Sequence, residues 1–199
     1  MNLPNKLTIL RIILVPIMVV IPMFNIQGDL LGVPITNIII DIIFIIASIT
    51  DKLDGYIARK RNQITTFGKF ADPLADKILV LAAMMMLVEM DKLPAWIPIV
   101  VIAREFIVSG YRLIAVEKGG KVIAASVWGK LKTATQMVAI ILAFVDSNAY
   151  GAFINQGITG FNLILNIITT ILMTISIIAA IFSGYDYLKN GKELFKEQK

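Results

Sequence analysis

Long apolar runs alternate with short polar segments along the chain, and six of the apolar runs approach the length of a membrane span. A helix needs about 20 predominantly apolar residues to cross a hydrocarbon core roughly 30 Å thick. The pattern therefore predicts an all-α, polytopic membrane protein with six transmembrane helices in one domain, residues 1–199. The expected spans are 7–25, 35–59, 69–90, 94–117, 126–146 and 160–187.

Two of these spans reach full length only if they include polar residues. The apolar part of the third, ILVLAAMMMLV, is too short unless its helix begins before Asp72. The fifth needs the preceding VWGKLKTATQ to complete MVAIILAFV. Because a carboxylate at the bilayer centre costs roughly 2.5–3.5 kcal/mol, these polar side chains are expected to face protein or water instead of lipid.

The composition agrees with a membrane protein and narrows the possible chemistry. The chain is 57% hydrophobic and 17% charged, whereas a soluble domain carries about 25% charged residues. It contains no cysteine and no histidine, which excludes disulfides, thiolate nucleophiles, Cys/His zinc sites and a histidine base. A metal would therefore need oxygen ligands, which favours Mg²⁺, Mn²⁺ or Ca²⁺.

The distribution of the positive residues behind the net charge of +5 indicates a membrane orientation and not a nucleic-acid partner. The loops at 26–34, 88–93 and 147–159 contain one basic residue among them, Lys92. By the positive-inside rule, both termini and the other links lie in the cytoplasm, which predicts a multi-pass protein of the cytoplasmic membrane. The cations on that side are Lys6, Arg59, Lys60, Arg61, Lys69, Arg112, Lys118, Lys121, Lys130, Lys132, Lys189, Lys192, Lys196 and Lys199.

Four aspartates lie where the second span ends and the third begins. Helical spacing puts one set on a face of the second helix and another on a face of the third: Asp51, Asp54, Gly55 and Ala58, then Gly68, Asp72 and Asp76. A short link makes the two helices antiparallel neighbours, so the carboxylates converge near the cytoplasmic interface. Unneutralised, they would repel one another, and four oxygen donors suit one or two divalent metals together with substrate phosphates.

A structural alternative pairs these acids, as interfacial helix ends, with nearby bases. The bases available for that are Arg59, Lys60, Lys69 and Lys77.

The acidic stretch resembles the signature of the CDP-alcohol phosphotransferases. That signature is Asp-x-x-Asp-Gly-x-x-Ala-Arg, eight residues, then Gly-x-x-x-Asp-x-x-x-Asp, and DKLDGYIAR and GKFADPLAD match it at every position. The resemblance covers the whole chain and implies a fold with six membrane helices, a homodimer and a site for two Mg²⁺ or Mn²⁺ ions. It also implies the reaction, in which an acceptor hydroxyl attacks the lipid-bearing phosphorus of a CDP-linked lipid and CMP leaves.

The same resemblance implies roles for individual residues. Asp51, Asp54, Asp72 and Asp76 would bind metal, and Asp72 and Asp76 are the catalytic pair, with Asp76 the base for the acceptor hydroxyl. The pocket for the CDP-lipid would be formed by residues of the signature and of the first helix: Asn5, Thr8, Gly55, Ala58, Arg59 and Gly68.

A second polar set, in AREFIVSGYR and WGKLKTATQ, is expected to choose the acceptor. Its members are Arg104, Ser109, Arg112, Lys130, Lys132, Thr133 and Gln136. A basic patch beside an acidic metal site indicates an acceptor that carries phosphate. Alternatively, these cations only follow the positive-inside rule and bind no ligand. That explanation suits Lys118 and Lys121. It does not explain Arg104, near the middle of a span, unless Glu105 or Asp41 pairs with it. Within the family, REFIVSG and GKLKT resemble phosphatidylglycerophosphate synthases, which implies CDP-diacylglycerol and sn-glycerol 3-phosphate as substrates.

Three other functions stay open from the sequence. A sibling enzyme would use inositol phosphate, serine or phosphatidylglycerol as acceptor. A divalent-cation transporter would use the carboxylates for conduction, although no polar path continues to the outer loops. A purely structural membrane scaffold would leave four convergent carboxylates without a stabilising reason.

Overall fold

The computed structural model describes residues 2–60, 65–117 and 126–190, and within them the chain is almost entirely helical. Six α-helices follow one another: α1 (Leu3–Val20), α2 (Ile35–Lys60), α3 (Thr66–Glu89), α4 (Trp96–Glu117), α5 (Val127–Val145) and α6 (Gly160–Asn190). Short 3₁₀ turns, η1 (Ile21–Phe24) and η2 (Ala152–Ile154), follow α1 and precede α6. The predicted helical class is confirmed, and each α-helix coincides with one apolar run.

A small hairpin departs from the all-α expectation. Strands β1 (Asp29–Leu30) and β2 (Val33–Pro34) pair antiparallel between α1 and α2. The two residues between them, Leu31 and Gly32, both have positive φ, 55° and 79°. Two consecutive positive φ values are typical of the tight turn that matches the twist of paired strands.

Local signals explain where two site-bearing helices begin. The Thr65 hydroxyl accepts a hydrogen bond from the Gly68 N–H at 3.0 Å, and the Ser126 hydroxyl accepts one from the Gly129 N–H at 3.2 Å. Such caps satisfy backbone donors that the first turn of a helix leaves free. The first helix starts earlier than predicted, at Leu3, because Pro4 falls in the first turn, where its missing N–H is tolerated.

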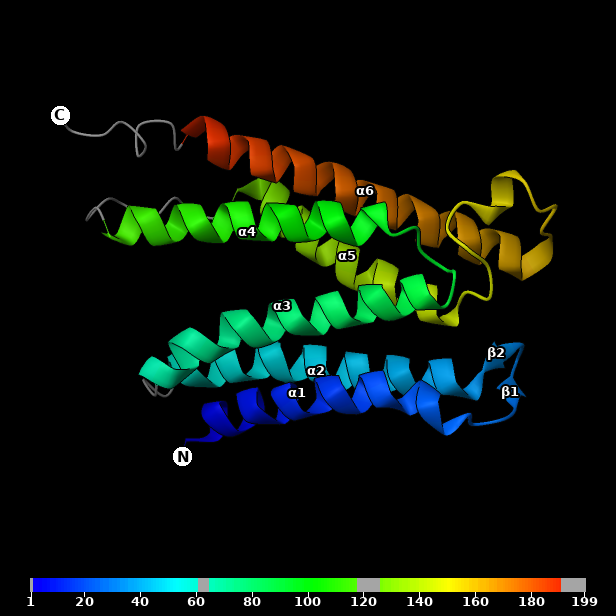
Figure 1. The fold of residues 1–199 in the computed structure, drawn as a ribbon, viewed down its shortest axis with the longest axis horizontal. Helices are drawn as coiled ribbons and strands as arrows, with labels where there is room; N and C mark the ends of the chain where they lie inside the picture. Colours follow the sequence, from blue (N-terminus) through cyan, green and yellow to red (C-terminus); the bar gives the residue numbers. More distant parts are fainter. Residues whose placement is uncertain (1, 61–64, 118–125, 191–199) are drawn as a thin grey trace.

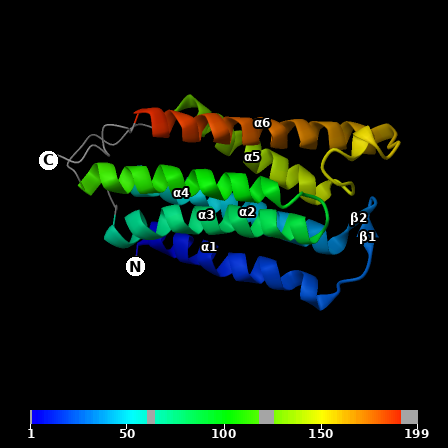
Figure 2. The ribbon, with the colours of Figure 1, turned by 45° about the horizontal axis from the view of Figure 1, so that its top comes forward.

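The helices run side by side along the long axis of the molecule (Figures 1 and 2). The starts of α1, α3 and α5 and the ends of α2, α4 and α6 lie at one end of the molecule (Figure 1). The hairpin, the α3–α4 link and the α5–α6 link lie at the opposite end. In the packing, α1 contacts α2 and α3, while α5 and α4 contact α6.

The interior is apolar, and so is much of the outer surface. Phe44 and Phe144 meet in the core with ring centroids 6.5 Å apart. Large apolar side chains also stay exposed on the outer faces, among them Phe106, Leu113 and Phe161 at 70% or more. Two described stretches, Leu3–Phe24 and Gly160–Lys189, are long and apolar enough to cross a membrane. Extensive apolar exposure of this kind marks a surface made for lipid or a partner.

At the hairpin end of the molecule, polar groups connect the α3–α4 link to the end of α5. Lys92 Nζ, in the α3–α4 link, donates to the carbonyls of Ala143, Phe144 and Asp146 at 3.1, 3.0 and 2.5 Å, which caps α5. Burial lowers the pKa of Lys92 to about 8. Asp41 on α2 interacts electrostatically with this lysine. Among the described residues, Asp41 interacts with Lys92 and not with Arg104, and its buried Oδ1 has no hydrogen-bond partner.

Candidate active site

Helix α1 contacts three of the four signature aspartates directly. Arg11 Nη1 donates to Asp51 Oδ1 at 2.6 Å, and its Nη2 donates to Asp54 Oδ2 at 2.5 Å. Thr8 Oγ1 donates to Asp72 Oδ1 at 2.6 Å. The end of α2 and the beginning of α3 therefore meet at α1, which bonds three of the four signature aspartates.

Arg11 is a site residue that the sequence pattern did not single out. It lies within the first apolar run and is fully buried, with 0% of its surface exposed. The available signal was the charge itself, because an ionisable side chain inside a membrane span marks a functional site by default. Of the four bases in the structural alternative, Lys60 lies over the Tyr56 ring and Lys77 bonds Ser109, while the side chains of Arg59 and Lys69 lie outside the described part of the structure.

The start of α3 brings the remaining predicted lipid-site residues together. Asn5 Oδ1 accepts from the Thr65 hydroxyl at 2.8 Å. A Cβ added at Gly68 would lie 3.4 Å from Asn5 Oδ1 and 3.5 Å from Asp72 Oδ2. Gly68 thus permits a close approach that a side chain would crowd. Gly55 is half-buried on α2 next to Asp54, while the side chains of Ala58 and Arg59 lie outside the described part of the structure.

The chemistry of these donors fits a hard divalent cation. The cluster offers only carboxylate oxygens, and Asp54 interacts electrostatically with both Asp51 and Asp72. Among the described residues, no three acidic side chains are spaced as a closed metal site, and the guanidinium of Arg11 lies against two of them. One oxygen each of Asp51 and Asp54 is bonded by Arg11, and one oxygen of Asp72 is bonded by the Thr8 hydroxyl, so these donors are shared with side chains of α1.

A polar cavity of about 180 Å³ adjoins Asp76. Its polar lining comes from α3, α4 and α5: Asp76, Arg104, Glu105, Arg112, Gly129, Lys132, Thr133 and Gln136. Five of the seven side chains predicted to bind the acceptor phosphate line this cavity. The cavity therefore places a basic set beside the fourth signature aspartate.

The basic side chains in this cavity are held by a shared network. Arg104 donates to Glu105 at 2.9 Å and to the Ser183 hydroxyl at 2.6 Å, and Lys132 Nζ donates to the same Glu105 oxygen at 2.7 Å. Arg112 Nη2 donates to the Tyr187 hydroxyl at 3.0 Å. Of the two partners suggested for Arg104, Glu105 is the one observed.

Gly129 also belongs to this network, although only the GKLKT motif pointed toward it. A Cβ at Gly129 would lie 3.1 Å from Arg104 Nη2, so the absence of a side chain lets the guanidinium pack against α5. Arg104 Nε is buried and has no hydrogen-bond partner among the described residues. A buried donor of this kind is costly unless a ligand or water satisfies it.

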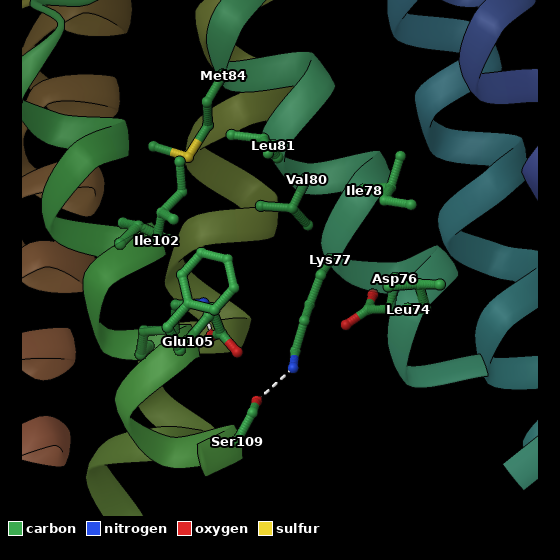
Figure 3. A pocket seen from close by; sticks show the side chains of 13 residues that line it. Leu74, Asp76, Lys77, Ile78, Val80, Leu81, Met84, Ile102, Glu105 and Ser109 are labelled. Carbon is green, nitrogen blue, oxygen red and sulfur yellow. Dashed lines mark hydrogen bonds and ion pairs between the residues drawn. The ribbon is translucent and has the colours of Figure 1, made fainter. Parts of the chain in front are cut away.

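The other two predicted phosphate ligands lie outside the polar cavity. Ser109 accepts a hydrogen bond from Lys77, which reaches across from α3 to α4 (Figure 3). Both line a largely apolar pocket of about 260 Å³ that also includes Asp76 and Glu105. Lys130 is exposed and lines a third pocket, between α2 and α5. Asp76 and Glu105 thus border a polar cavity on one side and an apolar pocket on the other.

The molecule is a bundle of helices with apolar outer faces, and it carries signature carboxylates at one end next to a basic cavity. A sequence model of the CDP-alcohol phosphatidyltransferase family matches residues 1–182. The chain therefore belongs to this family, a family of transferases.

Several curated proteins are similar to the chain over nearly its whole length. The CDP-diacylglycerol–glycerol-3-phosphate 3-phosphatidyltransferase of Bacillus subtilis is 38% identical, covering 98% of this chain and 97% of that protein. The Haemophilus influenzae protein of the same name is also 38% identical, over 96% and 94%. A probable phosphatidylglycerophosphate synthase of Mycobacterium tuberculosis is 34% identical, over 94% and 80%.

Proposed function

We propose that this chain is a membrane enzyme that transfers the phosphatidyl group from CDP-diacylglycerol to sn-glycerol 3-phosphate, releasing CMP and phosphatidylglycerophosphate. The observation that carries the proposal is the polar cavity, in which Asp76 adjoins Arg104, Arg112 and Lys132. The full-length similarity to relatives named for this activity supports the same acceptor. A divalent-cation transporter has no support from these relatives.

The basic side chains suit the phosphate of the acceptor. Arginine binds phosphate oxygens through two parallel N–H groups, whereas lysine acts as a point charge. Arg104 and Lys132 are already held by Glu105, so little side-chain freedom is lost when the phosphate binds. The unpartnered Arg104 Nε is a further donor for a ligand oxygen. The phosphate end of the acceptor would thereby be fixed with its hydroxyl near Asp76.

The transfer follows from this placement. Asp76 accepts the proton of the acceptor hydroxyl as the hydroxyl oxygen forms a bond to the lipid-bearing phosphorus. The bond from that phosphorus to the bridging oxygen breaks, and CMP leaves with the electron pair. A bound Mg²⁺ or Mn²⁺ pair would neutralise the diphosphate and both the attacking and the leaving oxygen. Asp51, Asp54 and Asp72 would hold these ions together with Asp76.

The CDP-lipid would bind to residues at the start of α1 and of α3. Asn5, Thr8 and Gly68 are adjacent there, and Gly55 lies beside Asp54 on α2. Ala58 and Arg59 complete this proposed set through the signature. With the nucleotide beside α1 and the acceptor between α3 and α5, the two substrates would meet at Asp72 and Asp76.

An acceptor panel tests the proposal. Purified protein receives CDP-diacylglycerol and one of sn-glycerol 3-phosphate, inositol phosphate, serine, phosphatidylglycerol or unphosphorylated glycerol, and CMP release is followed. Activity with sn-glycerol 3-phosphate alone is expected, and it should disappear on chelation and return with Mg²⁺ or Mn²⁺. Turnover with another acceptor only would identify a sibling enzyme. Metal flux into liposomes without CMP release would restore the transporter hypothesis.

We further propose six membrane spans with the active site and both termini in the cytoplasm, and a homodimer as the family resemblance implies. The alternation of helix ends in Figure 1 supports the topology. The chain has no cysteine, so single cysteines report orientation directly. Asn155→Cys should react with an impermeant maleimide on intact cells, and Lys189→Cys only after permeabilisation. The opposite pattern would reverse the topology, and the mass in nanodiscs tests the dimer.

A further inference from the structure

Two polar side chains on α1, three residues apart, together bond three proposed metal ligands, each through one carboxylate oxygen. Arg11 bonds Oδ1 of Asp51 and Oδ2 of Asp54, and Thr8 bonds Oδ1 of Asp72. Side chains of α1 therefore donate hydrogen bonds to one oxygen of each of three carboxylates. The second oxygen of each carboxylate does not take part in these bonds. A carboxylate held in this way has its plane and direction set by a residue that is not itself a ligand.

Burial makes this arrangement restrictive. Arg11 is 0% exposed, Thr8 is 1% exposed and the Asp54 side chain is 2% exposed, whereas the Asp51 side chain is 36% exposed. A buried guanidinium is tolerated only when acidic partners offset its desolvation, and removing one partner of such a pair leaves an uncompensated buried charge. The acids with which Arg11 pairs are the first two of the signature. The positions of the arginine and of the two carboxylates consequently depend on one another.

We propose that α1 forms the outer shell of the metal site, with Arg11 and Thr8 as positioning residues that orient Asp51, Asp54 and Asp72 toward a shared divalent cation. This inference rests on the metal site of the proposed function. Partners that hold metal ligands from behind typically contribute about 10–100-fold in metal affinity. The planar fork of arginine can hold two carboxylates at once, which the single ammonium of lysine cannot do in the same geometry.

A competing role for Arg11 predicts the opposite sign. If the guanidinium merely substitutes for the metal, it must leave before the ion binds. Removing its charge would then strengthen metal binding, because the positive group repels the incoming cation. If Arg11 positions the ligands, its removal weakens binding although the repulsion is also removed. The sign of the change in metal affinity therefore decides between the two roles.

The experiment measures Mn²⁺ binding to purified full-length protein in nanodiscs by electron paramagnetic resonance of the free ion. The variants are Arg11→Lys, Arg11→Gln, Thr8→Val and Thr8→Ser, with Asp72→Asn as the site control. Lys6→Gln, on the exposed face of α1, removes one positive charge elsewhere on the same helix. Binding should weaken about 10–100-fold in both Arg11 variants. It should also weaken in Thr8→Val, while Thr8→Ser and Lys6→Gln stay near wild type.

Unchanged or tighter Mn²⁺ binding in both Arg11 variants, with wild-type binding intact, would overturn the positioning role and leave the proposed metal site standing. If wild-type protein shows no saturable Mn²⁺ binding, or if Asp72→Asn does not abolish that binding, the proposed metal site is overturned and this inference with it. If an Arg11 variant elutes as aggregate, the Thr8 pair decides, since valine keeps the shape of threonine and lacks only its hydroxyl. Equal affinity of the Thr8 variants would then count against the outer shell.

Discussion

Lys132 on α5 donates to Glu105 on α4 over 2.7 Å, inside the cavity that Asp76 also lines. Arg104 donates to the same Glu105 oxygen, so one acid holds two of the three bases. The basic set is therefore not a simple cationic patch but a partly neutralised, fixed network. This explains how positive charge can be retained inside a largely apolar bundle and still be available to a phosphate.

Glu105→Gln should lower kcat/KM for sn-glycerol 3-phosphate by at least about tenfold, with a smaller change in KM for CDP-diacylglycerol. The substitution keeps the shape but removes the charge that holds Arg104 and Lys132, and a buried cation without its partner loses its position. Steady-state kinetics with each substrate varied in turn provide the measurement. Glu89→Gln, at the exposed end of α3, is the matched control. Equal losses for both substrates would contradict this role.

Alanine at Asp51, Asp54 or Asp72 should nearly abolish turnover, because each removes a proposed metal ligand. Asp76→Asn should do the same with less loss of CDP-lipid binding, since it removes the base for the acceptor. CMP release and equilibrium binding of the CDP-lipid separate the two effects. Asp91→Asn at the hairpin end should be close to wild type, because Asn tolerates the positive φ of 56° there. Wild-type activity after exhaustive chelation would refute the metal assignment.

Arg112→Ala should raise the KM for the acceptor more than the KM for the CDP-lipid. Arg112 lines the polar cavity, is exposed to it and donates to the Tyr187 hydroxyl. Tyr187→Phe removes that hydroxyl but leaves the arginine charge and the ring beneath it, so it should cause a smaller rise. Similar effects of Arg112→Ala on both substrates would argue against a contact with the acceptor phosphate.

Gly129→Ala should weaken acceptor binding, because the new Cβ would lie 3.1 Å from Arg104 Nη2 and force the guanidinium to move. The control is Gly110→Ala on α4, where an added Cβ meets nothing within 4 Å. That change should leave KM unaltered and stabilise the helix by up to about 1 kcal/mol. If both alanine variants bind the acceptor equally well, close packing of Arg104 on α5 is not needed for function.

Lys92→Met should lower the thermal stability without changing either KM, because α5 loses the donor that caps three carbonyls. Burial lowers the pKa of Lys92 from 10.5 to about 8, so between these values the unfolded chain binds more protons than the folded one. In that window Lys92 makes stability rise with pH. Unfolding temperatures from pH 7 to pH 10 should show this rise in the wild type, and a variant with the same slope would contradict it.

The sequence alone determined the local features of this protein. Run lengths placed six helices within a few residues of their bounds, since helix length and apolar content are local properties. The spacing of Asp72 and Asp76 put both on one side of α3, because helical periodicity is independent of what packs against the helix. The signature also identified the family, which the match over residues 1–182 bears out.

Only the tertiary structure decided which side chains meet across helices. Arg11 and Asp51 are forty residues apart, and nothing local to either predicts their contact. The rotation of α4 turns Ser109 toward Lys77 and Glu105 toward Lys132, and the α3–α4 link brings Lys92 near Asp41. These choices depend on how six helices pack together. Packing thereby makes Arg11, which the sequence pattern did not single out, a partner of two signature acids, and it selects Glu105 over Asp41 as the partner of Arg104.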